Sequence, residues 1–200
     1  MKKLTGFVFA LSIAFMSLTG QAMELSDLKP DGITVTHGKY IPSKADISTT
    51  RLSLRWNWNR NLLESSSWKL GGYFDLGYSR WRSHLSEKDQ PSPNGADKAW
   101  AASFTPVFRL EPESSAMLVP FLDVGVGVSY QSEKDLEKKL KSPINMGGHT
   151  QFEIRTVVGA RFGDQKQFEF SYGWFHYSNA NIHSQNEGLD FQLLSFGWNW

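Results

Sequence analysis

The chain has 200 residues, a formal net charge of +1 and no cysteine. A near-neutral charge spread along the chain argues against a basic surface for nucleic acid, and the lack of cysteine excludes disulfides, thiol catalysis and thiolate metal sites. The 14 Phe, 8 Trp and 6 Tyr residues are typical of a protein with aromatic girdles at two membrane interfaces.

The N-terminus predicts a secretory signal peptide. Lys2 and Lys3 precede the apolar run 4–18, and the small-residue site 20–22 closes it. This order of segments predicts cleavage after Ala22. A membrane-spanning helix is the alternative, which the small residues at the end of the run disfavour. Residues 1–22 are therefore predicted to be removed, and residues 23–200 to form one exported domain.

The mature sequence alternates between apolar and polar residues with a period of two. In the run around Leu52, the apolar residues Leu52, Leu54 and Trp56 alternate with Ser53 and Arg55. A strand places residues i, i+2 and i+4 on one face, so each such run predicts a strand with one apolar face. The predicted strands, of which the first is the weakest, are 32–40, 52–58, 68–79, 100–110, 118–129, 152–162, 168–174 and 193–200.

Eight such strands predict an all-β fold, an eight-stranded antiparallel transmembrane β-barrel. Such a barrel is too narrow for an open pore, so the charged face is expected to fill the lumen with ion pairs. A lipocalin-like soluble barrel would reverse the two faces, and alternation alone does not separate the two folds. The aromatic apolar face and the final Trp200 favour the membrane. The predicted inward charges are Arg55, Lys69, Asp75, Arg109, Asp123, Glu153, Arg155 and Arg161.

The connection lengths predict the orientation of the barrel. The turn 163–166 is short, whereas the connections 82–98 and 131–149 are long and polar. Barrels of this class keep short turns in the periplasm and long loops outside. Both termini are then periplasmic, the loop 179–188 is extracellular, and the strand before that loop ends at the outer leaflet.

Two polar residues interrupt the lipid-facing side of that strand. His176 and Ser178 continue the series of Tyr172 and Trp174 at every second position, so they share one face. An imidazole beside a hydroxyl is the base and nucleophile pair of acyl transfer. Asp190 has the parity of the lipid-facing residues in the last strand and could hold the imidazole tautomer. Interfacial hydrogen bonding without catalysis is the alternative for these residues.

The sequence around these residues resembles a known family. The stretches His176–Ala180 and Asn186–Asp190 resemble the C-terminal signature of the lipid A 3-O-deacylases, the PagL family, and the less specific stretches 54–58, 72–78, 104–108 and 120–127 look like strands of that family. The resemblance implies an active site on the outer wall of an eight-stranded barrel. It implies a metal-free hydrolase that releases the acyl chain ester-linked at position 3 of lipid A, with Ser178 as nucleophile and His176 as base.

The catalytic acid departs from the family pattern, because the family usually has a glutamate where this chain has Asp190. We predict Asp190 as the acid, with Glu187 in the adjoining loop as the fallback. Backbone N–H groups of Asn179 and Ala180, helped by Asn186, are the predicted oxyanion donors.

The predicted partners are lipopolysaccharide or lipid A and the outer membrane, with no nucleic acid; association of two barrels as a homodimer stays open. No cofactor and no metal are expected, since the other histidines lack metal-ligand spacing.

A non-enzymatic barrel that anchors the envelope or displays adhesive loops is the first alternative function, and it predicts that His176 and Ser178 are replaceable. Another lipid A acyl-modifying enzyme, such as an acyltransferase, is the second, and it needs a hydrocarbon slot where this lumen is predicted to be charged. The remaining histidines are His37, His84, His149 and His183.

Overall fold

A computed structural model describes residues 29–63, 67–84, 95–136 and 143–200. The chain divides into two units, Met1–Pro30 and Asp31–Trp200, and the description below concerns the second. The predicted signal peptide and its cleavage site lie outside the described residues. None of the described residues belongs to a helix that is long and apolar enough to cross a membrane.

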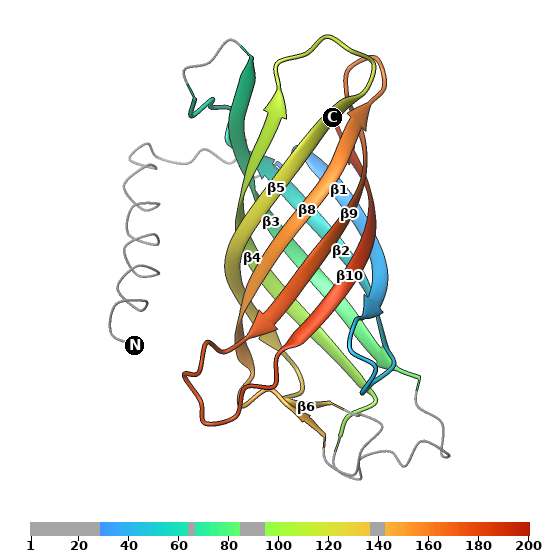
Figure 1. The fold of residues 1–200 in the computed structure, drawn as a ribbon, viewed down its shortest axis with the longest axis vertical. Coiled ribbons are helices and arrows are strands. Elements are labelled where there is room, and N and C mark those ends of the chain that lie inside the picture. The colour runs from blue at the N-terminus through green and yellow to red at the C-terminus, as the bar shows by residue number, and fades with distance from the viewer. Residues whose placement is uncertain (1–28, 64–66, 85–94, 137–142) are drawn as a thin grey trace. The chain divides into compact units, whose positions relative to one another are not determined.

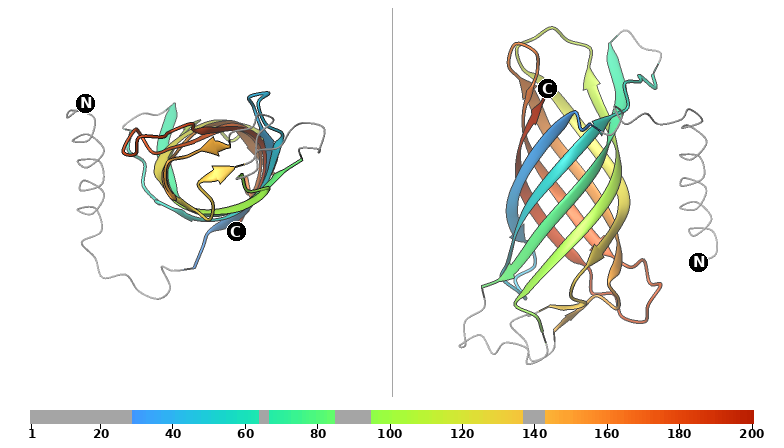
Figure 2. Two further views of the ribbon diagram at one scale, coloured as in Figure 1. Left: turned by 90° about the horizontal axis from the view of Figure 1, so that it is seen from below. Right: turned by 180° about the vertical axis from the view of Figure 1, so that it is seen from behind.

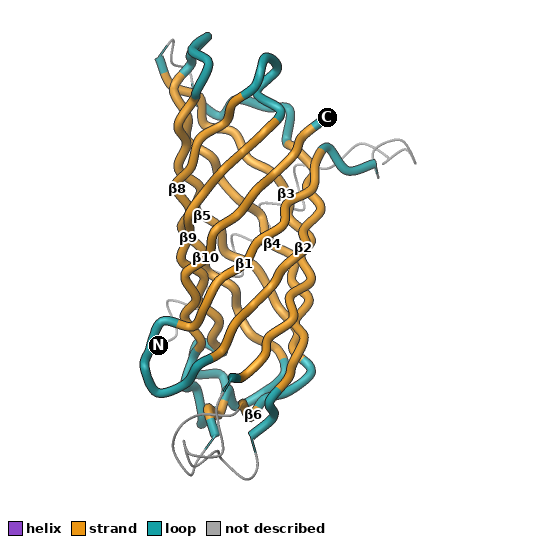
Figure 3. Tube along the Cα trace, turned by 90° about the vertical axis from the view of Figure 1, so that its right-hand side faces the viewer, coloured by secondary structure: helices purple, strands orange, loops and turns teal. Residues whose placement is uncertain are grey.

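Eight long antiparallel strands close into a barrel in the order β1-β10-β9-β8-β5-β4-β3-β2, which confirms the predicted fold (Figure 1). Closure pairs every strand on both sides, so the barrel has no free sheet edge. The tube in Figure 3 shows the strands running between two rims of loops and turns. The strands are β1 Gly32–Tyr40, β2 Ile47–Asn57, β3 Trp68–Ser83, β4 Lys98–Pro112, β5 Val119–Gln131, β8 Thr150–Phe162, β9 Phe168–Ser178 and β10 Leu189–Asn199.

The two rims differ. The turn end carries the connections 58–67, 113–118 and 163–167, and the loop end carries 41–46, 84–97, 132–149 and 179–188. Within the connection 132–149, β6 Asp135–Leu136 pairs with β7 Ile144–Asn145. Figure 2, seen along the barrel axis, places this hairpin inside the outline of the ring. The sequence did not predict it, because strands of two residues are too short for alternation to be visible.

The alternation in sequence becomes an alternation in burial. Along β5, every second residue is buried, beginning with Val119, and the residues between are exposed. Phe121 and Asp123 point inward, whereas Leu122 and Val124 are 39% and 44% exposed on the outer wall. The apolar face is therefore the outer one, as the transmembrane prediction requires and as a lipocalin-like barrel would not have.

Charged side chains fill the lumen from its middle to the turn end. Arg51 contacts Asp75 at 2.6 Å and Glu153 at 2.9 Å. Six of the eight charges predicted to point inward are buried: Arg55, Asp75, Arg109, Asp123, Glu153 and Arg155. A cavity between these networks has a volume of about 30 Å³, which is the space of about one water molecule.

The other two predicted charges lie at the mouth of the turn end. Arg161 is half-buried and contacts Glu111 at 3.0 Å. Lys69 is also half-buried, but it forms no ion pair with any residue that the structure describes. The ion pair of Lys69 therefore stays a prediction, and the residue lines a 180 Å³ cavity at the turn end.

The loop end of the lumen is apolar rather than charged, which differs from the prediction. The Trp81 ring lies 5.2 Å from that of Tyr177 and 5.6 Å from that of Phe191, measured between centroids. Ile144 and Met146, from the hairpin and the residues after it, are fully buried in the same cluster. The inward residues at these strand ends are aromatic. We call the cluster of Trp81, Tyr177, Phe191, Ile144 and Met146 the aromatic plug.

Glu169→Gln is expected to lower the unfolding temperature of the barrel. The Glu169 carboxylate is 4% exposed and contacts Arg55 at 2.7 Å and Arg109 at 2.5 Å. Removing one partner of a buried ion pair leaves an uncompensated charge and costs roughly 3–5 kcal/mol. The loss of heat-modifiable gel migration with temperature measures the effect, and the exposed Glu113→Gln is the control. Equal unfolding temperatures for the two variants would contradict this account of the lumen.

Candidate active site

β9 ends at the loop end of the barrel (Figure 1), and His176 and Ser178 are among its last three residues. β9 pairs with β10 on one side and β8 on the other, so that His176 stands opposite Asp190 and Ile154, and Ser178 opposite Phe152. Both side chains belong to the outward-facing series and are half-buried. The strand thus presents the imidazole and the hydroxyl on the outer wall, outside the lumen.

The register across the final hairpin brings Asp190 to His176. Asp190 Oδ1 lies 2.9 Å from His176 Nδ1, and the two side chains are 33% and 26% exposed. When Nδ1 carries the ring proton, it donates that proton to the carboxylate, and Nε2 is left with its lone pair as a base. Nε2 makes no hydrogen bond to any described residue, which leaves it open to a hydroxyl or a substrate.

The imidazole is packed on two sides. The Trp174 ring lies parallel to it, with centroids 5.5 Å apart and an interplanar angle of 18°. Gly188 approaches from the loop, where an added Cβ would lie 3.1 Å from His176 Cε1. Sequence reasoning missed both contacts. Trp174 could have been found, because it precedes His176 by two residues on the same strand face.

Gly188→Ala is therefore expected to reduce activity without unfolding the barrel. Gly188 has a φ of 36°, which an alanine adopts with strain, and the new methyl group would press on the imidazole. Because a catalytic group displaced by about 1 Å can cost about 100-fold in rate, we expect a loss of that order in kcat. The rate of ester release measures it, with Gly71→Ala at the turn end as the control, because an added Cβ there would lie 3.6 Å from its nearest neighbour, Arg60 O. Wild-type turnover in a folded Gly188→Ala variant would show that this contact does not fix the ring.

The residue after Ser178 anchors the loop. The Asn179 side chain is 1% exposed and its Nδ2 donates to the carbonyl oxygens of Met146 at 2.8 Å and Gln185 at 2.7 Å. Ala180 follows with a φ of 51°. The hydrogen bonds tie the chain directly behind Ser178 to the connection that carries β6 and β7, so the hydroxyl stands at a fixed point rather than at a loose strand end.

The predicted oxyanion donors are near Ser178 but are not equally available. The Asn179 backbone N–H donates to Asn186 Oδ1 at 2.9 Å, and Asn186 Nδ2 donates to Asn181 Oδ1 at 3.1 Å. The Ala180 N–H forms no backbone hydrogen bond in the described part of the chain. Of the two backbone N–H groups, that of Ala180 is the better candidate for the oxyanion donor. Asn186 accepts the Asn179 N–H and so holds the peptide between Ser178 and Asn179.

The Glu187 carboxylate contacts two other connections of the loop end. Its Oε2 accepts from the Asn145 N–H at 2.9 Å, and its Oε1 lies 3.4 Å from Lys44 Nζ. These contacts join three connections at the loop end. The carboxylate that contacts His176 is that of Asp190, which is the acid preferred from sequence.

Three of the remaining histidines lie apart from this site, whereas His183 belongs to the loop 179–188, where its backbone N–H lies 3.5 Å from Asn179 Oδ1. His37 contacts Thr50, His84 contacts Ser48, and His149 contacts the Gln131 carbonyl oxygen. Among the described residues, no three His, Asp or Glu side chains are grouped so that they could hold a metal ion.

Comparisons with known proteins point to one family. A family model described as "Lipid A 3-O-deacylase (PagL)" matches residues 48–199. The curated lipid A deacylase PagL of Pseudomonas aeruginosa is 30% identical over 148 residues, which cover 74% of this chain and 76% of the relative. The crystal structure of the outer membrane enzyme PagL aligns with a TM-score of 0.68 at 26% identity, over 84% of this chain and 99% of that one. Neisserial surface protein A, with a TM-score of 0.50 at 13% identity over 84% and 95% of the two chains, shares the fold alone.

Proposed function

Because this chain belongs to the lipid A 3-O-deacylase (PagL) family of outer-membrane ester hydrolases, we propose that Ser178, His176 and Asp190 hydrolyse the acyl ester at position 3 of lipid A. The observation that carries the proposal is the 2.9 Å contact between Asp190 and His176 on the strand face that also bears Ser178. Family membership decides against a non-enzymatic barrel. The loop end is taken as extracellular, which places the site at the outer leaflet.

The first half of the reaction transfers the acyl chain to the enzyme. His176 Nε2 takes the proton of the Ser178 hydroxyl as Oγ attacks the ester carbonyl carbon. The carbonyl oxygen becomes an oxyanion, which the Ala180 N–H would bind. The bond from the acyl carbon to the sugar oxygen then breaks, and the imidazolium returns its proton to that oxygen. Asp190 stabilises the imidazolium by accepting the hydrogen bond from Nδ1.

The second half releases the fatty acid. A water molecule from the membrane interface attacks the acyl carbon, and His176 Nε2 takes one of its protons. The bond to Ser178 Oγ breaks, and Oγ recovers a proton from the imidazolium, so the enzyme returns to its starting state. The balance is one ester and one water consumed, and one carboxylic acid and one sugar hydroxyl formed.

The outer wall supplies the surface for the acyl chains. Beyond His176, toward the middle of the barrel, Tyr172, Phe170 and Val158 are 48%, 55% and 54% exposed. Hydrocarbon chains can follow this apolar wall within the bilayer without leaving it. An acyltransferase with a slot inside the barrel fits less well, because the described lumen is filled by ion pairs and the aromatic plug.

Mass spectrometry of lipid A tests the proposed function. Cells that produce the protein are expected to contain lipid A lighter by the one acyl chain attached at position 3, and cells without it the intact lipid. Purified protein added to lipid A in detergent should release the same fatty acid. Release of an acyl chain from another position, or transfer of a chain to a second lipid, would contradict the assignment.

A further inference from the structure

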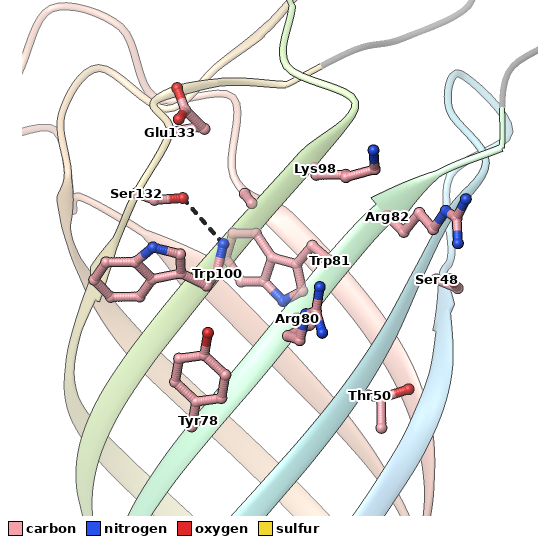
Figure 4. Close-up of a pocket in the computed structure, with 11 residues that line it drawn as sticks. Ser48, Thr50, Tyr78, Arg80, Trp81, Arg82, Lys98, Trp100, Ser132 and Glu133 are labelled. Carbon is pink, nitrogen blue, oxygen red and sulfur yellow. Dashed lines mark hydrogen bonds between the residues drawn. The ribbon is translucent and has the colours of Figure 1, made fainter.

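A pocket of about 700 Å³ opens on the outer wall of the barrel (Figure 4). It lies over β2, β3 and β4 at the loop end. In the ring of strands, β3 is four strands from β9 in either direction, so the pocket and the proposed active site occupy opposite walls at the same end of the barrel.

The pocket is basic. Arg80 and Arg82 point outward from β3, and Lys98 points outward from the neighbouring β4; all three side chains are exposed. Neither arginine forms an ion pair with any residue that the structure describes. Lys98 has Asp97 at 3.5 Å, but both are more than 60% exposed, and such surface pairs are weak. Glu133 is the one carboxylate among the lining residues.

Hydroxyl groups flank the two arginines. The register pairs Arg80 with Thr50 on β2 and Arg82 with Ser48 on the same strand. Thr50 and Ser48 both line the pocket. Guanidinium groups bind phosphate oxygens through paired N–H donors. Thr50 Oγ1 lies 3.0 Å from His37 Nδ1 and Ser48 Oγ lies 2.7 Å from His84 Nε2, and each hydroxyl can donate to a phosphate oxygen when the imidazole N–H is the donor of that pair. This donor set matches a phosphorylated headgroup.

An aromatic row fixes the depth of the pocket in the membrane. Tyr78, Trp100 and Tyr130 form consecutive ring contacts, with centroids 6.1 Å and 5.9 Å apart. Tyr and Trp rings gather where hydrocarbon meets headgroups. Arg80 and Arg82 follow Tyr78 toward the loop end, so their charges lie at the level of lipid headgroups.

The wall next to the pocket suits acyl chains. Leu52, Leu76 and Phe104 are 48%, 46% and 47% exposed. Leu76 and its partner Phe104 lie on the middle-facing side of Tyr78, and Leu52 stands opposite Tyr78 on β2. A lipid whose phosphate contacts the arginines can lay its chains along these residues. We propose that this pocket binds the phosphorylated lipid A headgroup of one lipopolysaccharide molecule as a second, non-catalytic site.

Binding of a lipid that cannot be a substrate tests the proposal. The probe is lipid A that lacks the 3-acyl chain and keeps both phosphates, titrated against the full barrel in detergent. We expect the double variant Arg80→Gln, Arg82→Gln to bind the probe at least about tenfold more weakly than wild type. Each single variant should have an affinity between those of the double variant and wild type. Arg60→Gln, which removes an exposed arginine at the turn end, should bind as wild type does. A dephosphorylated probe should bind all four variants and wild type equally.

The outcomes separate this proposal from the proposed deacylation. The probe lacks the ester at position 3, and its binding affinity is measured without any reaction at Ser178. Unchanged affinity in folded Arg80→Gln, Arg82→Gln and double variants would overturn the proposal, as would displacement of the probe by millimolar inorganic phosphate, which indicates a small-anion site. The double variant should release fatty acid at the wild-type rate from saturating substrate. A parallel fall in that rate would place the pocket in substrate recognition and overturn the second site.

Discussion

Ser178→Ala is expected to abolish ester release from lipid A while the barrel still folds. The hydroxyl is the group proposed to form the acyl-enzyme, and loss of the nucleophile in a serine hydrolase costs about 10⁶-fold in kcat. His176→Asn should have an effect of the same order, because without a base the hydroxyl keeps its proton. Fatty acid release from lipid A in detergent measures the rate, and heat-modifiable gel migration shows that each variant is folded.

Ser184→Ala is the matched control, since Ser184 is an exposed serine in the same loop. It should retain wild-type activity. Full activity in a folded Ser178→Ala barrel would remove this residue from the mechanism. It would favour the alternative that these side chains only form hydrogen bonds at the membrane interface.

Asp190→Asn is expected to depress kcat by about 10⁴-fold, with little change in KM. An amide can still contact Nδ1, but it favours the wrong imidazole tautomer and does not stabilise the imidazolium; the same exchange has about this effect in a serine protease. Asp190→Glu should retain activity, because it restores the residue that the family usually has. Its longer side chain must fold back to reach Nδ1, which lies 2.9 Å from the present carboxylate.

Glu187→Gln is the comparison that decides between the two acids. The amide oxygen can still accept from the Asn145 N–H, and the ion pair with Lys44 that is lost is partly exposed. Such a pair contributes about 0–1 kcal/mol, so kcat should stay near the wild-type value. If Glu187→Gln lost activity and Asp190→Asn kept it, both the choice of acid and the geometry behind it would be wrong.

The period-two pattern was sufficient to predict the barrel and to place three of the candidate site residues on one side of the sheet. Parity put His176 and Ser178 on one face, and an antiparallel hairpin brought Asp190 beside them. These inferences needed only strand geometry, in which the direction of a side chain follows from its position in the sequence.

The surroundings of the site were not predictable in the same way. The partners of Asn179 are carbonyl groups of Met146 and Gln185, and which carbonyl a loop presents depends on backbone conformation rather than on residue type. The positive φ of Ala180 belongs to the same loop, and neither has a periodic signal. Likewise, alternation showed which residues face the lumen, but it did not show that the inward aromatic residues gather at one end.

The aromatic plug has a consequence for where the reaction products go. Trp81, Tyr177 and Phe191 occupy the cross-section of the barrel directly behind the wall that carries His176. No route through the described lumen therefore joins the proposed site to the periplasm. On the proposed function, a released fatty acid and the shortened lipid A are expected to leave along the outer wall, so turnover changes the surrounding lipid without opening the membrane to solutes.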